Sequence, residues 1–206
     1  MIIYLLIVLL ATALCQILGA FFSGFFIDKF DKYHNKVLIA EIAIMFLISI
    51  EIIYVGITIS LFSLIGVLAG IVLVFMINIF VPHKHVDGFE RLGLLVFIAM
   101  CIHEFPEGIA FGSTFLLDSG VGLLTAVLIS LHNIPEGAII VIPYLLKKKF
   151  KQAFVLTIVT QILYVLGGLA AFFFLADFSP AAQAFSACIA AGAMLFIAFE
   201  ELNFLK

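Results

Sequence analysis

His-Glu-Phe-Pro-Glu-Gly at residues 103–108 is followed, 29 positions later, by His-Asn-Ile-Pro-Glu-Gly at 132–137, and both strings lie inside long apolar segments. In a helix, residues four apart lie on the same face, so each histidine is expected beside the glutamate of its own string. The resulting pairs are His103 with Glu107 and His132 with Glu136. Imidazole and carboxylate groups together form a ligand set for a divalent cation. The repeated string therefore predicts two metal-binding half-sites on two membrane helices.

Other residues of the two strings add to this ligand set. Glu104 and Asn133 follow the histidines at about 100° around the helix, on the same inward-facing arc. Pro106 and Pro135 have no N–H, so each leaves the carbonyl four residues earlier without its helical partner and free to turn toward an ion or a water-filled cavity. We therefore expect a metal site made of His103, Glu104, Glu107, His132, Asn133 and Glu136, with Pro106 and Pro135 interrupting the helical hydrogen bonding beside it.

The composition of the whole chain is that of a membrane protein. Of its 206 residues, 66% are hydrophobic and 11% are charged, which does not fit an ordinary soluble domain. Seven apolar segments are long enough to cross a hydrocarbon layer of about 30 Å, and they fall at 2–27, 37–60, 61–81, 91–114, 121–145, 152–176 and 182–201. The second and third adjoin, so we expect a tight hairpin around Gly56 to Ser63. The sequence predicts an all-α, polytopic membrane helical bundle of about seven transmembrane helices, embedded in a lipid bilayer as a single domain, 1–206.

The basic residues predict the orientation. All ten lie in the first, third and fifth loops or at the C-terminus of this arrangement. They are Lys29, Lys32, Lys36, Lys84, Arg91, Lys147, Lys148, Lys149, Lys151 and Lys206. Cytoplasmic loops are enriched in Lys and Arg, so we expect the N-terminus outside and the C-terminus in the cytoplasm.

An ionisable group at membrane depth costs on the order of 2.5–3.5 kcal/mol, so those of the two strings need pairing, protonation, water or a metal. Other such residues are candidates for a cation pathway. Glu51 lies near the outer end of the second segment and could line an entrance. Glu201 ends the last segment, and its charge there is explained either by a solvated helix end or by an exit path for cations. His83 and His85 could chelate a metal weakly or be two solvated loop histidines.

Cysteine usage and the absence of other motifs narrow the function further. Cys15, Cys101 and Cys188 lie in apolar segments without paired spacing, so they predict neither disulfides nor a thiolate metal site. The sequence contains no nucleotide or nucleic-acid signature. We therefore expect no organic cofactor and no nucleic-acid partner.

At these residues the chain resembles the ZIP family of divalent metal transporters, in particular its GufA-like bacterial type. The two His-x-x-Pro-Glu-Gly strings are similar to the paired metal-site helices of that family, its fourth and fifth spans. Ile-Phe-Val-Pro-His-Lys-His at 79–85 resembles the end of its third span and its cytoplasmic histidine-bearing loop, and 190–202 resembles its seventh span. The resemblance covers nearly the whole chain.

The resemblance implies two adjoining ion positions. The ligands of the first would be His103, Glu107 and Glu136, with His132 completing the cluster. Glu104 and Asn133 would join the shared glutamates to hold or relay a second ion. The resemblance also implies that metal moves toward the cytoplasm while a bundle of the first, fourth, fifth and sixth spans slides against a scaffold. It further implies a homodimer and a location in the plasma (inner) membrane.

Three features depart from the family pattern. Glu104 stands where the family usually has Asn, which would tighten binding, shift the metal preference or serve protons. The sixth span lacks the Glu that the family usually has there, and Gln161 would replace it only in part, as a residue of the pathway. The family has eight spans, whereas this sequence predicts seven, so either the sequence is a fragment or the fold lacks the usual eighth helix.

The ligand types indicate which ions are carried. Imidazole suits Zn²⁺ and Fe²⁺, and the excess of carboxylate widens the tolerance toward Mn²⁺. We expect transport of Zn²⁺, with Fe²⁺ or Mn²⁺ close behind, into the cytoplasm and no enzymatic activity. One alternative is a non-transporting metal-binding relative, a sensor or scaffold. The other is an intramembrane metalloenzyme with Glu104 as general base, although the second histidine of a His-Glu-x-x-His helix is absent.

Overall fold

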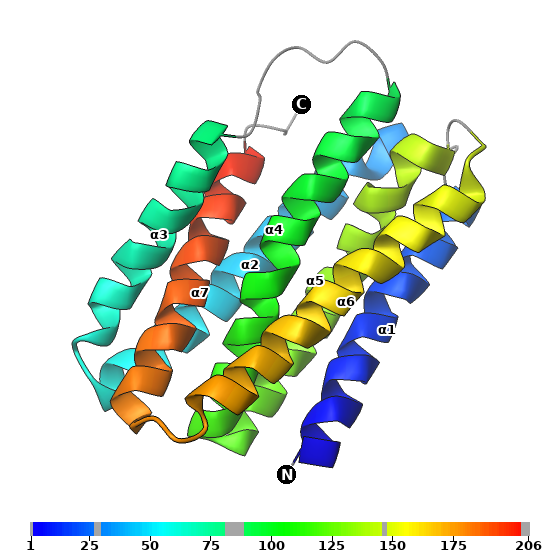
Figure 1. Ribbon diagram of the computed structural model, residues 1–206. Coiled ribbons are helices and arrows are strands. Elements are labelled where there is room, and N and C mark those ends of the chain that lie inside the picture. Colours follow the sequence, from blue (N-terminus) through cyan, green and yellow to red (C-terminus); the bar gives the residue numbers. More distant parts are fainter. Residues whose placement is uncertain (1, 27–29, 81–88, 146–147, 203–206) are drawn as a thin grey trace.

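The computed structural model describes residues 2–26, 30–80, 89–145 and 148–202. These residues form α-helices and no strand, so the predicted all-α bundle of seven helices is confirmed (Figure 1). The helices are α1 (Ile2–Phe26), α2 (Phe30–Ile59), α3 (Ser63–Phe80), α4 (Phe89–Leu117), α5 (Ser119–Leu145), α6 (Phe150–Leu175) and α7 (Pro180–Glu201).

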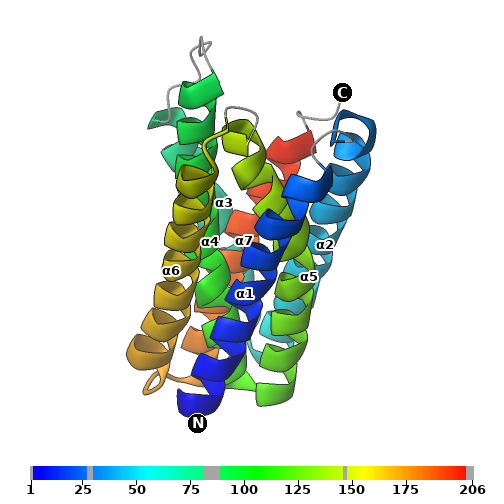
Figure 2. The same ribbon diagram turned by 90° about the vertical axis from the view of Figure 1, so that its right-hand side faces the viewer.

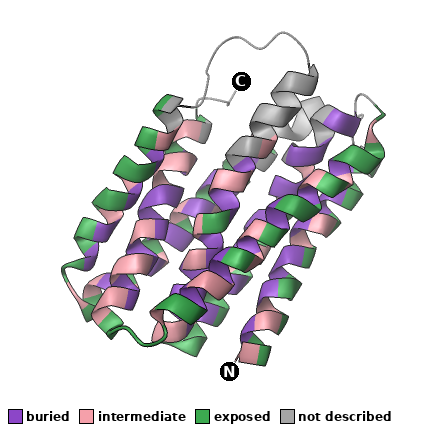
Figure 3. Ribbon diagram, viewed as in Figure 1, coloured by how far each residue is buried: buried purple, intermediate pink, exposed green. Residues whose placement is uncertain are grey.

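The outer surface of the bundle is apolar. Ile3 and Leu14 of α1, for example, are 71% and 55% exposed. Figure 3 shows exposed residues in green on the outward faces and buried residues in purple between the helices. Five helices of the described chain are long and apolar enough to cross a membrane, at Ile2–Gly24, Leu38–Ile59, Ser119–Ala138, Phe150–Leu175 and Pro180–Glu200. Because apolar side chains on this scale favour lipid over water, the protein is an integral membrane protein.

The other two predicted spans are α3 and α4. The described apolar part of α3 covers Ser63–Ile77. α4 carries His103, Glu104 and Glu107 in its middle, and all three side chains are buried. α4 packs against α5, α6 and α7, so these polar residues face protein.

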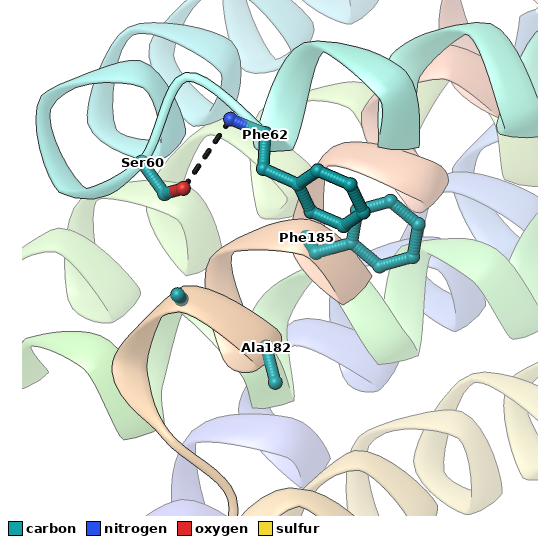
Figure 4. A pocket seen from close by; sticks show the side chains of 5 residues that line it. Ser60, Phe62, Ala182 and Phe185 are labelled. Carbon is teal, nitrogen blue, oxygen red and sulfur yellow. Dashed lines mark hydrogen bonds between the residues drawn. The ribbon is translucent and has the colours of Figure 1, made fainter.

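The turn between α2 and α3 is the tight hairpin that the sequence predicted. α2 ends at Ile59 and α3 begins at Ser63. The Phe62 N–H donates to Ser60 Oγ at 3.3 Å, and the Phe62 ring stacks on Phe185 of α7 with centroids 5.1 Å apart (Figure 4). An open cavity of about 360 Å³ is lined by Ser60, Phe62, Ala181, Ala182 and Phe185. The stacked rings attach the hairpin to the start of α7.

The connections between helices lie alternately at the two ends of the bundle, as the distribution of Lys and Arg over alternate loops predicts. In Figures 1 and 2 the N-terminus of α1 and the α2–α3, α4–α5 and α6–α7 connections lie at one end of the bundle. The opposite end holds the C-terminus of α7, the start of α2 and the α5–α6 connection. The start of α2 carries the exposed Lys36, and the exposed Lys148 lies between α5 and α6. Which end faces the cytoplasm stays a prediction from the basic residues.

Glycines of the two repeated strings allow close helix packing. A Cβ atom at Gly108 of α4 would lie 2.0 Å from the carbonyl oxygen of Tyr164 in α6. A Cβ atom at Gly137 of α5 would lie 2.1 Å from the carbonyl oxygen of Gln16 in α1. Any larger residue would push the helices apart, and small residues are what membrane helices use for close backbone approach. The last residue of each string thus packs α4 against α6 and α5 against α1.

Candidate metal centre

The two strings come together between α4 and α5, which pack side by side near the middle of the bundle. His103, Glu107, His132 and Glu136 are each at most 2% exposed. One ligand atom of each lies within 4.8 Å of the ligand atoms of the other three. Each histidine is one helical turn from its own glutamate, as the spacing of four residues requires. The structure therefore joins the two predicted half-sites into one buried cluster, which we call the His/Glu cluster.

The ligand atoms of the His/Glu cluster face one another. Nε2 of His103 lies 3.2 Å from Nε2 of His132 and 3.1 Å from Oε1 of Glu107. It lies 3.6 Å from Oε1 of Glu136. Nε2 of His132 lies 3.4 Å from Oε1 of Glu107 and 3.9 Å from Oε2 of Glu136. Each imidazole nitrogen thus approaches both carboxylates, including the one on the neighbouring helix.

These spacings fit a small cation with four ligands. Around a tetrahedral zinc ion with bonds of about 2.0–2.1 Å, neighbouring ligand atoms lie about 3.3 Å apart. The contacts of the two imidazole nitrogens with each other and with the carboxylate oxygens are 3.1 to 3.9 Å long, and one ligand atom of each residue lies within 4.8 Å of the others. With both carboxylates ionised and both imidazoles neutral, the cluster would carry two negative charges, which a divalent cation would neutralise. Because charge buried without a partner is costly, this donor set suits such an ion.

Glu104 and Asn133, the other two predicted ligands, are fully buried beside this cluster. Glu104 Oε1 accepts a hydrogen bond of 2.6 Å from Nε2 of Gln161 in α6. Asn133 donates from Nδ2 to the carbonyl oxygen of Thr12 in α1 at 3.4 Å. In the described chain, Asn133 Oδ1 accepts no hydrogen bond, and Glu104 Oε2 has only the nearby Gln16 amide as a potential donor. One oxygen of each side chain is therefore weakly engaged by the described residues.

The prolines of the strings lie inside continuous helices. α4 extends through Pro106 and α5 through Pro135, and both rings are partly buried. The helices hold because their other backbone hydrogen bonds and the packing around them remain. A role for the carbonyls of Ile102 and Leu131 at the metal stays a prediction.

The predicted pathway residues lie in different places. Glu51 of α2 is partly buried and accepts from the Thr125 hydroxyl of α5 at 3.2 and 3.4 Å. Thr125 lies seven residues, about 10 Å along the helix, before His132, so Glu51 is near the cluster but not part of it. Glu201 is the last residue of α7, and its side chain lies outside the description. His83 and His85 lie outside the described residues.

Two buried polar residues of α1 were not among the predicted site residues. Thr12 and Gln16 are at most 1% exposed and belong to the polar surroundings of the cluster, together with Tyr164 of α6. Gln16 lies near Glu104, and Thr12 accepts from Asn133. Their spacing of four residues in an otherwise apolar segment was a signal that one polar face of α1 turns inward.

The sequence of this chain matches that of a known protein family. The sequence model of the ZIP Zinc transporter family matches residues 82–203, which is more than half of the chain and includes both strings of the His/Glu cluster. A comparison with curated proteins gave no match. The members of the matching family are metal transporters rather than enzymes. The chain belongs to the ZIP zinc transporter family.

Proposed function

We propose that this protein carries a divalent transition metal ion across the membrane into the cytoplasm, with Zn²⁺ as the first substrate and Fe²⁺ or Mn²⁺ close behind. The observation that carries the proposal is the His/Glu cluster, whose four ligand atoms lie within 4.8 Å of one another in a buried place between two helices. Mixed imidazole and carboxylate ligands accept all three ions. In this proposal His103, Glu107, His132 and Glu136 bind the transported ion.

Glu104 and Asn133 are proposed to serve a second, adjoining position. Support comes from their full burial and from the two oxygen atoms, Glu104 Oε2 and Asn133 Oδ1, for which no well-formed hydrogen bond exists in the described chain. Oxygen ligands alone hold Zn²⁺ less firmly than imidazole does, so an ion passes more easily from such a position. Glu51 would receive the ion on the outer side, and Glu201, His83 and His85 would meet it on the cytoplasmic side.

The packing supports movement of two helix sets during transport. Every described glycine that brings two helix backbones together does so within one set, either α1, α4, α5 and α6 or α2, α3 and α7. Gly19 and Gly137 join α1 to α5, Gly108, Gly112 and Gly167 join α4 to α6, and Gly66, Gly70 and Gly192 join α3 to α7. Close packing resists shear, whereas side chains at the boundary between the sets can exchange partners. We infer that the first set, which carries the ion, slides against the second.

The remaining parts of the proposal concern the whole protein. Residues 1–206 would form one transmembrane domain, because α1 and α2 pack on the helices of the family match. The N-terminus would lie outside the plasma membrane and the C-terminus in the cytoplasm, as the basic residues indicate. Two copies would associate as a homodimer.

A non-transporting metal sensor or scaffold is the second candidate. The observation that favours it is on α6, where Gln161 presents an amide to Glu104 and no carboxylate is available. Such a protein would bind the ion in the His/Glu cluster but would not release it to the other side.

Metal accumulation in living cells separates these functions. Cells lacking their own zinc uptake would express the wild-type chain or His132→Ala/Glu136→Ala, and radioactive Zn²⁺ inside the cells would be counted over time. We expect faster accumulation with the wild-type chain only, and competition by unlabelled Fe²⁺ and Mn²⁺. Accumulation equal to that of cells without the protein would contradict inward transport.

A further inference from the structure

The carboxylate of Glu104 is held by an amide from a different helix. Gln161 is 3% exposed and Glu104 is fully buried, and the distance of 2.6 Å between Gln161 Nε2 and Glu104 Oε1 is short. In this hydrogen bond the Gln161 NH₂ group donates to the carboxylate, and this direction fits the ionised form that binds a metal, because an ionised carboxylate can only accept hydrogen bonds. Gln161 therefore serves Glu104 as a donor, with its own oxygen turned elsewhere.

This hydrogen bond makes the two oxygens of Glu104 different. Oε1 is engaged by Gln161 at 2.6 Å, whereas Oε2 is buried and has only the nearby Gln16 amide of α1 as a potential donor in the described chain. Oε1 of Gln161 is buried there without a hydrogen-bond partner. Polar atoms buried without a partner cost free energy, so this arrangement suits a site that is completed by a cation or by water.

The position of Gln161 is fixed by the packing one turn away. Gly108 lies four residues after Glu104 in α4, and Tyr164 lies three residues after Gln161 in α6. At this level the α6 backbone approaches so closely that a Cβ atom at Gly108 would lie 2.0 Å from the Tyr164 carbonyl oxygen. The close contact sets the distance between the two helices, and at that distance the Gln161 amide reaches the Glu104 carboxylate.

We propose that Gln161 is a positioning residue that acts through Glu104: it holds one carboxylate oxygen and thereby orients the other as a metal ligand. The inference rests on the proposed function, because the orientation of Glu104 matters only where a metal binds. Partners that orient a ligating carboxylate change metal affinity about 10–100-fold when they are removed. Through this contact, α6 helps to shape the site on α4.

The test uses the purified full-length chain in detergent and measures Zn²⁺ affinity by competition with a chelating fluorescent dye. Gln161→Leu should weaken Zn²⁺ binding about 10–100-fold. Thr160→Val is the matched control, since Thr160 is also buried in α6 but its hydroxyl donates at 2.9 Å to the Thr157 carbonyl of its own helix. This control should bind as the wild type does. In a Glu104→Ala background Gln161→Leu should have no further effect, because the interaction partner is gone.

A second readout separates positioning from a general loss of structure. The visible absorption of bound Co²⁺ reports the ligand geometry, so Gln161→Leu should change this spectrum while Thr160→Val should not. If Gln161→Leu does not fold, Gln161→Met takes its place, since it has nearly the same size and shape as Gln and no hydrogen-bond donor. Wild-type affinity and spectrum in the Gln161 variant, or an equal loss in the Glu104→Ala background, would overturn the inference. No Zn²⁺ binding by the wild-type chain would instead refute the proposed function.

Discussion

Replacing Gly108 by alanine should separate α4 from α6. The added Cβ would lie 2.0 Å from the Tyr164 carbonyl oxygen, and a distance below 3.0 Å is not tolerated, so the backbones must move apart by about 1 Å. A gap of that size forfeits about a quarter to a half of the dispersion energy of each contact at this face. Overpacking of this kind costs about 1–3 kcal/mol. For a chain of this length the loss corresponds to a melting temperature lower by about 2–12 °C.

The assay for Gly108→Ala is thermal unfolding of the purified protein in detergent, followed by circular dichroism. Gly24→Ala is the control, because a Cβ atom at Gly24 of α1 meets nothing within 4 Å. Gly24→Ala should leave the melting temperature unchanged, and Gly137→Ala should lower it as Gly108→Ala does, since its Cβ would meet the Gln16 carbonyl at 2.1 Å. Equal melting temperatures for Gly108→Ala and Gly24→Ala would refute the close packing of α4 on α6.

Three other predictions concern the ion and its path. Glu107→Gln should weaken Zn²⁺ binding at least tenfold, or by about 1.4 kcal/mol, because Oε1 of Glu107 lies 3.1 and 3.4 Å from the two imidazole nitrogens. Calorimetric titration measures this loss, and an unchanged affinity would remove Glu107 from the ligand set. Acidification from neutral to mildly acidic pH should weaken Zn²⁺ binding, since protons compete for the imidazole and carboxylate ligands. Dye competition across this pH range should show a steady decline in Zn²⁺ affinity, and an affinity that does not change with pH would speak against these ligands. Glu51→Gln should slow Zn²⁺ uptake into vesicles, while the amount of Zn²⁺ bound at saturation stays the same. Thr125→Val is the control, because it removes the hydrogen bond of 3.2 Å to Glu51 and keeps the charge of Glu51. Loss of bound metal in Glu51→Gln would place Glu51 in the binding site itself.

Helical spacing was enough to predict the His/Glu cluster. The four-residue interval fixes the face of each helix, and the repetition of the string indicated that the two faces belong together. The hairpin between α2 and α3 followed from the excessive length of one apolar run. α2 itself begins at Phe30, well before its apolar segment, because hydropathy marks the part in the hydrocarbon layer while helical hydrogen bonding continues beyond it.

The surroundings of the cluster could not be predicted in the same way. The contact between Gln161 and Glu104 depends on how α6 rotates against α4, and that rotation follows from packing at Gly108 and Tyr164. Likewise Gln16 joins the site because α1 packs on α5 at Gly137. Such tertiary contacts leave no periodic pattern in a segment that is apolar almost all round. The sequence therefore predicted that His103, Glu107, His132 and Glu136 gather and named Gln161 as a pathway residue, but it missed Thr12 and Gln16 of α1.

The most direct test of the central claim is Zn²⁺ uptake into proteoliposomes that contain only the purified chain. A zinc-sensitive dye inside the vesicles reports the rate, and bound metal is counted in parallel for the wild type and for His132→Ala/Glu136→Ala. The account predicts saturable uptake by the wild type, with both uptake and bound Zn²⁺ lost in the double variant. Saturable uptake that persists in the double variant, or binding by the wild type without any uptake, would contradict transport through the His/Glu cluster.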